Sequence, residues 1–212
     1  MQSLYQDAPQ GSSDEVCALG STSEAIAKSL LRSVGWFDGA GKTLEIGAGF
    51  GAMTRILVQS GVPISVVEPF SSYDFQGLGV EFYRSLAEVP EGKKFKWIFL
   101  VEVIEHVADP VEFLKEVSRF IEPDGKVFVT TPNARGIAAR VQAFGWRELA
   151  NPTHLWLFSP DSLAEVFRRA GYSRFERQFS PIQYKSSFFK NILLSLTQRV
   201  GIDGGLRYVL SK

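Results

Sequence analysis

Short apolar runs alternate with amphipathic helical patterns along most of the chain. Runs typical of buried strands occur at 43–46, 63–68, 96–101 and 126–131, with shorter candidates at 80–83, 172–178 and 206–210. Apolar residues at helical spacing occur at 52–60, 110–121 and 160–170, and also at 21–34 and 188–200. Strands that alternate with helices form parallel sheets. We therefore predict an α/β fold with a doubly wound, mostly parallel seven-stranded sheet, helices on both faces, and 206–210 as an antiparallel edge strand.

Capping and turn residues mark the ends of several predicted elements. Asp109-Pro110 and Ser159-Pro160 each combine an N-cap side chain with a proline in the first helical turn. Gly61 and Gly171 are placed to end helices. Residues 122–125 (Glu-Pro-Asp-Gly) are typical of a turn, so the fifth strand is predicted to begin at Lys126.

The domain organisation is predicted to be simple. Residues 1–20 are polar and contain helix-breaking residues, so we expect a flexible N-terminal arm, followed by a single domain over 21–212. Residues 134–158 follow the carboxyl end of the fifth strand and are rich in aromatic residues. This is where a substrate cover belongs in such a sheet, although the same aromatics are compatible with core packing. We call residues 134–158 the cover segment.

A glycine-rich loop follows the first strand. Gly47, Gly49 and Gly51, with Ala48 between them, allow a sharp turn and a close approach of a ligand to the following helix N-terminus. Gly47-x-Gly49-x-x-Ala52 also satisfies the dinucleotide-binding fingerprint. The loop alone is therefore compatible with NAD and with S-adenosylmethionine.

Two acidic residues help to distinguish these cofactors. Glu68 ends the second strand 17 residues after Gly51 (68 − 51), where a carboxylate can accept both hydroxyls of a ribose. A surface carboxylate without a ligand is the alternative for Glu68. Glu45 lies two residues before Gly47, where it would attract a ligand's ammonium group and oppose a pyrophosphate. The short chain also lacks an obvious second domain for a hydride-transfer substrate, so S-adenosylmethionine is favoured.

Composition and charge exclude several classes of protein. Twenty-three basic and twenty-three acidic residues balance, so no overall field attracts nucleic acid, and we do not expect a nucleic-acid partner. A single cysteine, Cys17, excludes an internal disulfide framework. The N-terminal residues do not resemble a signal peptide and no apolar run has a membrane-spanning length, so we expect a cytoplasmic protein.

Several motifs resemble those of class I S-adenosylmethionine-dependent methyltransferases, namely residues 44–51, 67–69, 102–110 and 121–125. Residues 154–163 and 170–172 resemble the branch that includes ubiquinone-biosynthesis O-methyltransferases, and the similarity spans about 22–178. The resemblance implies a Rossmann-like methyltransferase fold. It also implies that S-adenosylmethionine is bound by Glu45, Gly47, Ala48, Gly49, Gly51, Glu68, Pro69, Val101 and Glu102. One departure is that residues 82–86 offer no carboxylate for the adenine amino group.

An acidic and histidine-containing cluster follows the fourth strand. Glu102, Glu105 and His106 would lie on one face of a helical turn, and His154 begins the later motif. Carboxylate and imidazole ligands suit Mg²⁺, Mn²⁺ or Zn²⁺, and the set resembles the metal site of small-RNA 2′-O-methyltransferases. Two alternatives remain open: His106 or His154 acts as a metal-free catalytic base, or these residues are structural.

The predicted function is methyl transfer from S-adenosylmethionine to a hydroxyl of a small-molecule substrate, such as a phenol, a sugar or a vicinal diol. In-line attack on the sulfonium methyl needs no covalent enzyme intermediate. The alternatives are an NAD-dependent oxidoreductase and a noncatalytic module that binds S-adenosylmethionine.

Overall fold

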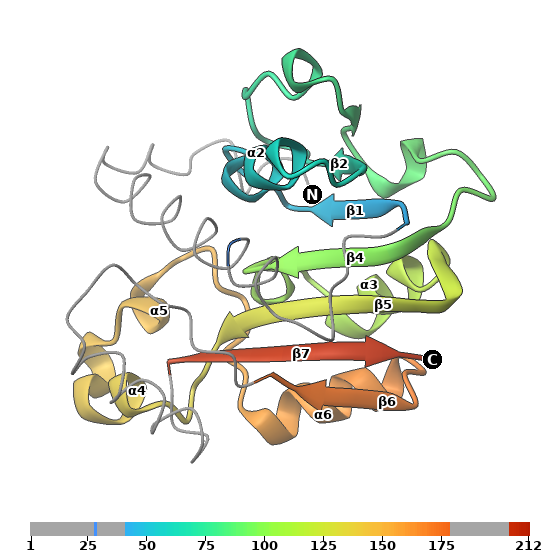
Figure 1. The fold of residues 1–212 in the computed structure, drawn as a ribbon. Helices are drawn as coiled ribbons and strands as arrows, with labels where there is room; N and C mark the ends of the chain where they lie inside the picture. The colour runs from blue at the N-terminus through green and yellow to red at the C-terminus, as the bar shows by residue number, and fades with distance from the viewer. Residues whose placement is uncertain (1–27, 29–40, 179–203) are drawn as a thin grey trace.

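The computed structural model describes residues 28, 41–178 and 204–212. The predicted arm at 1–20 and, apart from Lys28, the helical patterns at 21–34 and 188–200 lie outside these residues. One seven-stranded sheet organises the described part, in the order β3-β2-β1-β4-β5-β7-β6 (Figure 1). Its strands are β1 (Thr43–Ile46), β2 (Ile64–Val67), β3 (Glu81–Tyr83), β4 (Phe95–Val101), β5 (Ile121–Pro132), β6 (Arg174–Arg177) and β7 (Gly205–Ser211).

All neighbouring strands from β3 to β5 are parallel, and β7 is antiparallel to both β5 and β6. The central strand β4 is buried along nearly its whole length because its sequence is almost continuously apolar. The predicted doubly wound, mostly parallel sheet is therefore confirmed.

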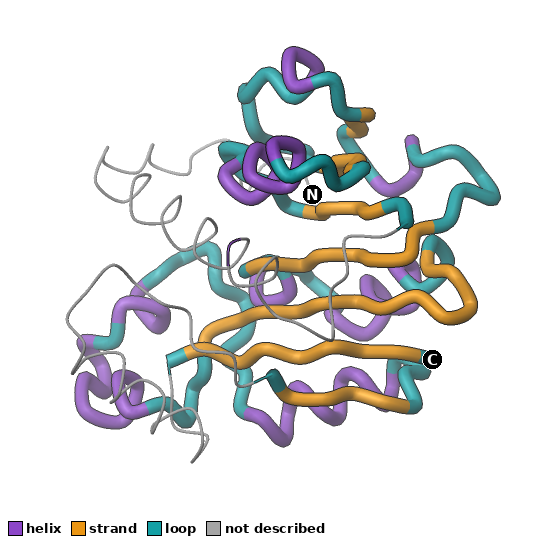
Figure 2. Tube along the Cα trace, viewed as in Figure 1, coloured by secondary structure: helices purple, strands orange, loops and turns teal. Residues whose placement is uncertain are grey.

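Helices lie on both faces of the sheet, and the short helices α4 (Ile137–Gln142) and α5 (Arg147–Ala150) lie beyond the carboxyl end of β5 (Figure 1). The longer helices are α2 (Ala52–Gln59), α3 (Pro110–Val117) and α6 (Pro160–Arg169). Short helices complete the described set: η1 (Gln76–Leu78), η2 (Leu86–Glu88), η3 (Ile104–His106), α4 (Ile137–Gln142), η4 (Ala143–Gly145) and α5 (Arg147–Ala150). Figure 2 shows α4 and α5 beyond the carboxyl end of β5. Within the described ranges, no helix is both long and apolar enough to cross a membrane.

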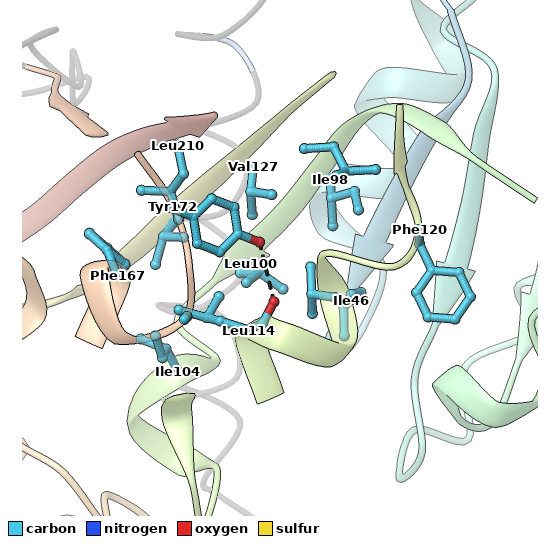
Figure 3. Packing of buried hydrophobic residues seen from close by; sticks show 14 of the residues in the cluster. Ile46, Ile98, Leu100, Ile104, Leu114, Phe120, Val127, Phe167, Tyr172 and Leu210 are labelled. Carbon is cyan, nitrogen blue, oxygen red and sulfur yellow. Dashed lines mark hydrogen bonds between the residues drawn. The ribbon is translucent and has the colours of Figure 1, made fainter. Parts of the chain in front are cut away.

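Two hydrophobic clusters hold the layers together. On one face, α3 and α6 pack on the sheet through buried residues that include Leu114 and Phe167 (Figure 3). The hydroxyl of Tyr172 donates a hydrogen bond to the Leu114 carbonyl at 3.3 Å, which ties the turn after α6 to α3. On the other face, Met53 and Leu57 of α2 pack against aromatic residues of β4 and β5.

Two predicted element assignments were wrong. Strand β7 is antiparallel as expected, but it lies between β5 and β6, so β6 forms the edge. Strand β5 begins at Ile121, which was assigned to the preceding helix. The register shifts between the Phe95–Ile121 and Trp97–Lys126 pairs, so residues 122–125 form an irregularity inside the strand and not a turn before it.

Candidate functional site

The glycine-rich loop connects the carboxyl end of β1 to α2. Gly47 and Gly51 have φ angles of 76° and 68°, which are left-handed values that favour glycine. A Cβ on Gly47 would lie 2.5 Å from Cγ2 of Val103, so the loop packs directly on the segment after β4. Gly51 is the N-cap residue of α2, so the loop presents backbone N–H groups at that helix end.

Glu68 fastens this loop to the end of β2. Its Oε2 accepts a hydrogen bond from the Gly49 amide at 2.8 Å. Its Oε1 accepts hydrogen bonds from the amides of Phe70 at 2.7 Å and Ser71 at 3.1 Å. Pro69 therefore lies in the turn between Glu68 and Phe70. The structure therefore brings the predicted ribose-binding carboxylate against the glycine loop, as the motif spacing required.

Glu45 is buried beneath the same loop. The hydroxyl of Thr54, on α2, donates a hydrogen bond to Oε2 of Glu45 at 2.5 Å. Burial raises the pKa of Glu45 to about 7, and the nearby charge of Glu68 adds to this shift, while the Thr54 hydrogen bond opposes it. Thr54 was not identified from the sequence, because a threonine inside a helix gives no signal of a partner on β1.

Glu102 follows Val101 at the end of β4 and has a φ of 55°, which is rare for a residue with a side chain. Its amide donates to the Thr130 carbonyl at 3.1 Å, and the Thr130 hydroxyl donates to Oε1 of Glu102 at 2.8 Å. Burial raises the pKa of Glu102. These hydrogen bonds hold Glu102 where β4 and β5 end side by side. The next residue, Val103, is the one that packs on Gly47 of the glycine-rich loop.

Glu105 is the most deeply buried carboxylate after β4. It lies in the 3₁₀ turn η3 and is completely inaccessible to solvent. The Thr131 hydroxyl donates to its Oε2 at 3.0 Å, whereas its buried Oε1 has no hydrogen-bond partner among the described residues. Burial and the charge of Glu102 raise the pKa of Glu105 well above its usual value. A buried oxygen without a partner is costly unless a cation or a proton satisfies it.

His106 and His154 meet beside Glu105 although they are 48 residues apart (154 − 106). Their ring centroids are 4.7 Å apart in an edge-to-face arrangement. Nδ1 of His106 lies 2.9 Å from the Thr153 carbonyl oxygen, and Nδ1 of His154 lies 3.1 Å from the Glu148 carbonyl oxygen. Burial lowers the pKa of both histidines, so both rings are neutral near pH 7.

Three of the four predicted metal ligands form a compact group. One ligand atom each from Glu105, His106 and His154 lies within 4.8 Å of the others. Glu102 is not part of this group, because η3 begins after it and its side chain is directed to Thr130. The prediction that Glu102, Glu105 and His106 share one helical face is therefore wrong. Glu105 and His106 are instead joined by His154 of the cover segment.

The cover segment is joined to the η3 turn by backbone and side-chain hydrogen bonds. The amides of Leu155 and Trp156 donate to the Glu105 carbonyl at 2.8 and 3.2 Å. The indole N–H of Trp156 donates to the Val107 carbonyl at 2.9 Å. Of the four aromatics singled out from the sequence, Trp146 and Phe158 are buried, whereas Phe144 is 94% exposed and Trp156 is 44% exposed. Trp146 and Phe158 therefore pack in the interior, whereas the role of the segment as a substrate cover stays a prediction.

Thr130, Thr131 and Glu148 contact candidate site residues, and the sequence does not identify them. Thr130 and Thr131 are polar residues at the end of the otherwise apolar run of β5, and that position next to the motif after β4 is the signal that could have found them. Glu148 lies in α5 of the cover segment. Its carboxylate Oε2 is 3.6 Å from Nδ1 of His154, which no local sequence pattern indicates.

A family model described as a methyltransferase domain matches residues 20–174 of the chain. The ubiquinone biosynthesis O-methyltransferase of Cereibacter sphaeroides is 26% identical over 174 residues, covering 71% of this chain and 68% of that protein. The mitochondrial ubiquinone biosynthesis O-methyltransferase of Arabidopsis thaliana is 29% identical over 152 residues, covering 63% of this chain and 47% of that protein.

Solved structures share the fold. A methyltransferase from Archaeoglobus fulgidus, described as dependent on S-adenosylmethionine, aligns with a TM-score of 0.64 and 15% identity, covering 90% of this chain and 94% of the other. Phosphoethanolamine N-methyltransferase 2 of Haemonchus contortus, in complex with S-adenosylmethionine, aligns with a TM-score of 0.59 and 15% identity. The alignment covers 88% of this chain and 52% of the other. Of the two cofactors that the glycine loop permits, these findings select S-adenosylmethionine over NAD. The chain belongs to the methyltransferase domain family and is a class I S-adenosylmethionine-dependent methyltransferase.

Proposed function

We propose that the protein methylates a hydroxyl group of a small molecule held between the η3 turn and the cover segment. The relatives from Cereibacter and Arabidopsis are named as O-methyltransferases, which supports oxygen as the acceptor atom. The observation that carries the proposal is the group of Glu105, His106 and His154, in which a buried carboxylate oxygen with no hydrogen-bond partner in the described part of the chain lies beside two neutral imidazoles. Such a group can take a proton or coordinate a cation.

In this proposal, S-adenosylmethionine would lie over the glycine loop. The Glu68 carboxylate, held against the loop, would accept the ribose hydroxyls, and Glu45 in its ionised form would attract the ammonium group. The remaining contacts come from the loop and the two strand ends, through Gly47, Ala48, Gly49, Gly51, Pro69, Val101 and Glu102. Holding the acceptor hydroxyl in line with the sulfonium methyl group would lower the entropic part of the barrier.

The residues fit a divalent metal such as Mg²⁺, Mn²⁺ or Zn²⁺. Oε1 of Glu105 has no hydrogen-bond partner among the described residues and can bind a cation in place of a proton, and the two imidazoles are uncharged and therefore able to coordinate. Glu105, His106 and His154 would hold the ion. When bound, a divalent metal lowers the pKa of a hydroxyl that coordinates to it, and it favours acceptors with two adjacent oxygens.

Without a metal, an imidazole would take the acceptor's proton directly. Nδ1 of each histidine faces a backbone carbonyl oxygen, so Nδ1 carries the proton and Nε2 is the basic atom. Either Nε2 can then accept the hydroxyl proton as the oxygen attacks the methyl group.

Turnover assays with S-adenosylmethionine and matched phenols, catechols, sugars and amines test the acceptor. We expect methylation of hydroxyl substrates, and transfer to the amines alone would overturn O-methylation. Isothermal titration with Mg²⁺, Mn²⁺ and Zn²⁺, on wild type and on Glu105→Gln, tests the metal. We expect Glu105→Gln to weaken metal binding, because the amide removes the negative charge of the ligand. The matched control is Glu112→Gln, because that carboxylate is exposed on α3.

The proposed metal site would be contradicted if none of the three ions gave binding heat and EDTA did not change turnover. A histidine that acts as a base without a metal would then be the remaining mechanism.

A further inference from the structure

We propose that Glu148 is a positioning residue for His154, so that the cover segment supplies both the histidine and the carboxylate that orients and polarises it. This inference rests on the proposed function, since it concerns the work of His154 at the same site. Glu148 belongs to neither the metal-ligand group nor any motif that the sequence indicated.

The first support is that both oxygen types of Glu148 face one nitrogen. The backbone carbonyl oxygen of Glu148 lies 3.1 Å from Nδ1 of His154, and its carboxylate Oε2 lies 3.6 Å from the same atom. The side chains are 16% and 6% exposed, so water has little access to this contact. Nδ1 therefore carries a proton that points toward two acceptors, and Nε2 keeps its lone pair.

The two oxygens contribute differently. The backbone carbonyl is within hydrogen-bond distance, whereas the carboxylate at 3.6 Å acts through its charge. A negative charge behind the N–H group of an imidazole increases the basicity of the opposite nitrogen. This effect is useful at Nε2 whether that atom accepts a proton or binds a cation.

Arg147 fixes the direction of the Glu148 carboxylate. Its Nε and Nη2 atoms donate to Oε1 of Glu148 at 2.9 and 2.6 Å, which leaves Oε2 on the side of His154. Arg147 is itself largely exposed, with 74% of its side chain accessible. Its contribution is therefore screened by solvent, and the inner carboxylate carries most of the effect.

The experiment compares Glu148→Gln with Glu165→Gln, which removes a carboxylate from an exposed pair with Arg168 on α6. We expect Glu148→Gln to lower kcat by about 10-fold to 100-fold, with an unchanged unfolding temperature and an unchanged Kd for S-adenosylhomocysteine. Glu148→Asp should restore part of kcat. Glu165→Gln should behave as wild type.

Nitrogen NMR of the His154 ring gives a readout that does not require turnover. In wild type we expect the proton on Nδ1, and in Glu148→Gln a shift of the Nδ1 and Nε2 signals that Glu165→Gln does not produce. Identical His154 spectra in wild type and Glu148→Gln would overturn the positioning role, as would a kcat within twofold of wild type while His154→Gln is inactive. If His154→Gln keeps full activity, the proposed function of His154 fails, whereas the ring spectra still decide whether Glu148 orients it.

Discussion

The carboxylate of Glu45 links the charge of the site to the stability of the fold. It is buried between β1 and α2, with the Thr54 hydroxyl as its hydrogen-bond donor. Its pKa is raised from 4.5 to about 7, mainly because burial disfavours the charged form. The folded protein therefore holds a proton on Glu45 at pH values where the unfolded chain has lost it.

This difference predicts how stability depends on pH. Between about pH 4.5 and pH 7 the folded state binds more protons than the unfolded state, so stability falls as pH rises through this window. The contribution of Glu45 is present in full below pH 4.5 and is lost above pH 7, a change on the order of 3 kcal/mol. In urea denaturation, the free energy of unfolding of Glu45→Gln should fall less from pH 5 to pH 7.5 than that of wild type.

Glu112→Gln serves as the control. If the free energies of unfolding of wild type and Glu45→Gln change with pH in parallel, the raised pKa of Glu45 is contradicted.

At the residue scale, the sequence identified ligand-type residues better than it identified their partners. The positions of Glu68, Glu105 and His106 follow from motifs that come directly after strands, whereas His154 lies in a later motif within the cover segment. The donors to these carboxylates do not, because Thr131 is 26 residues from Glu105 and becomes its neighbour only when β4 and β5 pair. Burial, which sets the pKa values, likewise depends on packing across the whole sheet.

Among the elements, β5 departs most from its predicted form. Residues 122–125 have the composition of a turn, yet the chain continues in the sheet with a register shift opposite β4. Local propensity describes these residues well, but pairing of Ile121 with Phe95 extends the strand beyond them. Gly125 allows this path, because a Cβ there would lie 2.7 Å from Cγ1 of Ile121 and 2.9 Å from the Phe95 carbonyl oxygen.

Gly125→Ala should therefore destabilise the protein, since the Phe95 backbone cannot move without disturbing β4. We expect a loss of about 1–3 kcal/mol in the free energy of unfolding, measured by urea denaturation. Gly145→Ala is a matched control, because among the described residues no heavy atom beyond its chain neighbours lies within 4 Å of a Cβ at that position. Equal stabilities of the two variants would show that β5 tolerates the side chain.

For the whole molecule, the alternation of strands and helices was sufficient to predict the parallel sheet and the edge at which the site lies. The position of β7 was not predictable in the same way. An apolar run at 206–210 indicates a strand, but only the long-range pairing of Leu206 with Thr131 and of Leu210 with Phe175 places it inside the sheet. Antiparallel insertion leaves no local mark on the sequence.

Cofactor binding at this sheet edge should stabilise the folded protein as a unit. S-adenosylhomocysteine at about 100 times its Kd adds about 2.7 kcal/mol to the free energy of unfolding. For a protein of 212 residues, we expect the unfolding temperature to rise by about 5–11 °C in a thermal melt. NADH at the same concentration should leave the melt unchanged. A shift with NADH alone would contradict the assignment of the glycine loop to S-adenosylmethionine.

The interior position of β7 also affects the order in which the sheet can be completed during synthesis. Strands β5 and β6 leave the ribosome before β7, yet β6 pairs with β7 and with no other described strand. Until β7 is made, one edge of β5 and the edge of β6 that faces β7 lack their sheet partner. Charged residues on an unpaired strand discourage association with other chains, and β6 carries Arg174, Glu176 and Arg177 among its four residues. The same charges that protect the sheet edge of the finished protein therefore also protect the nascent chain.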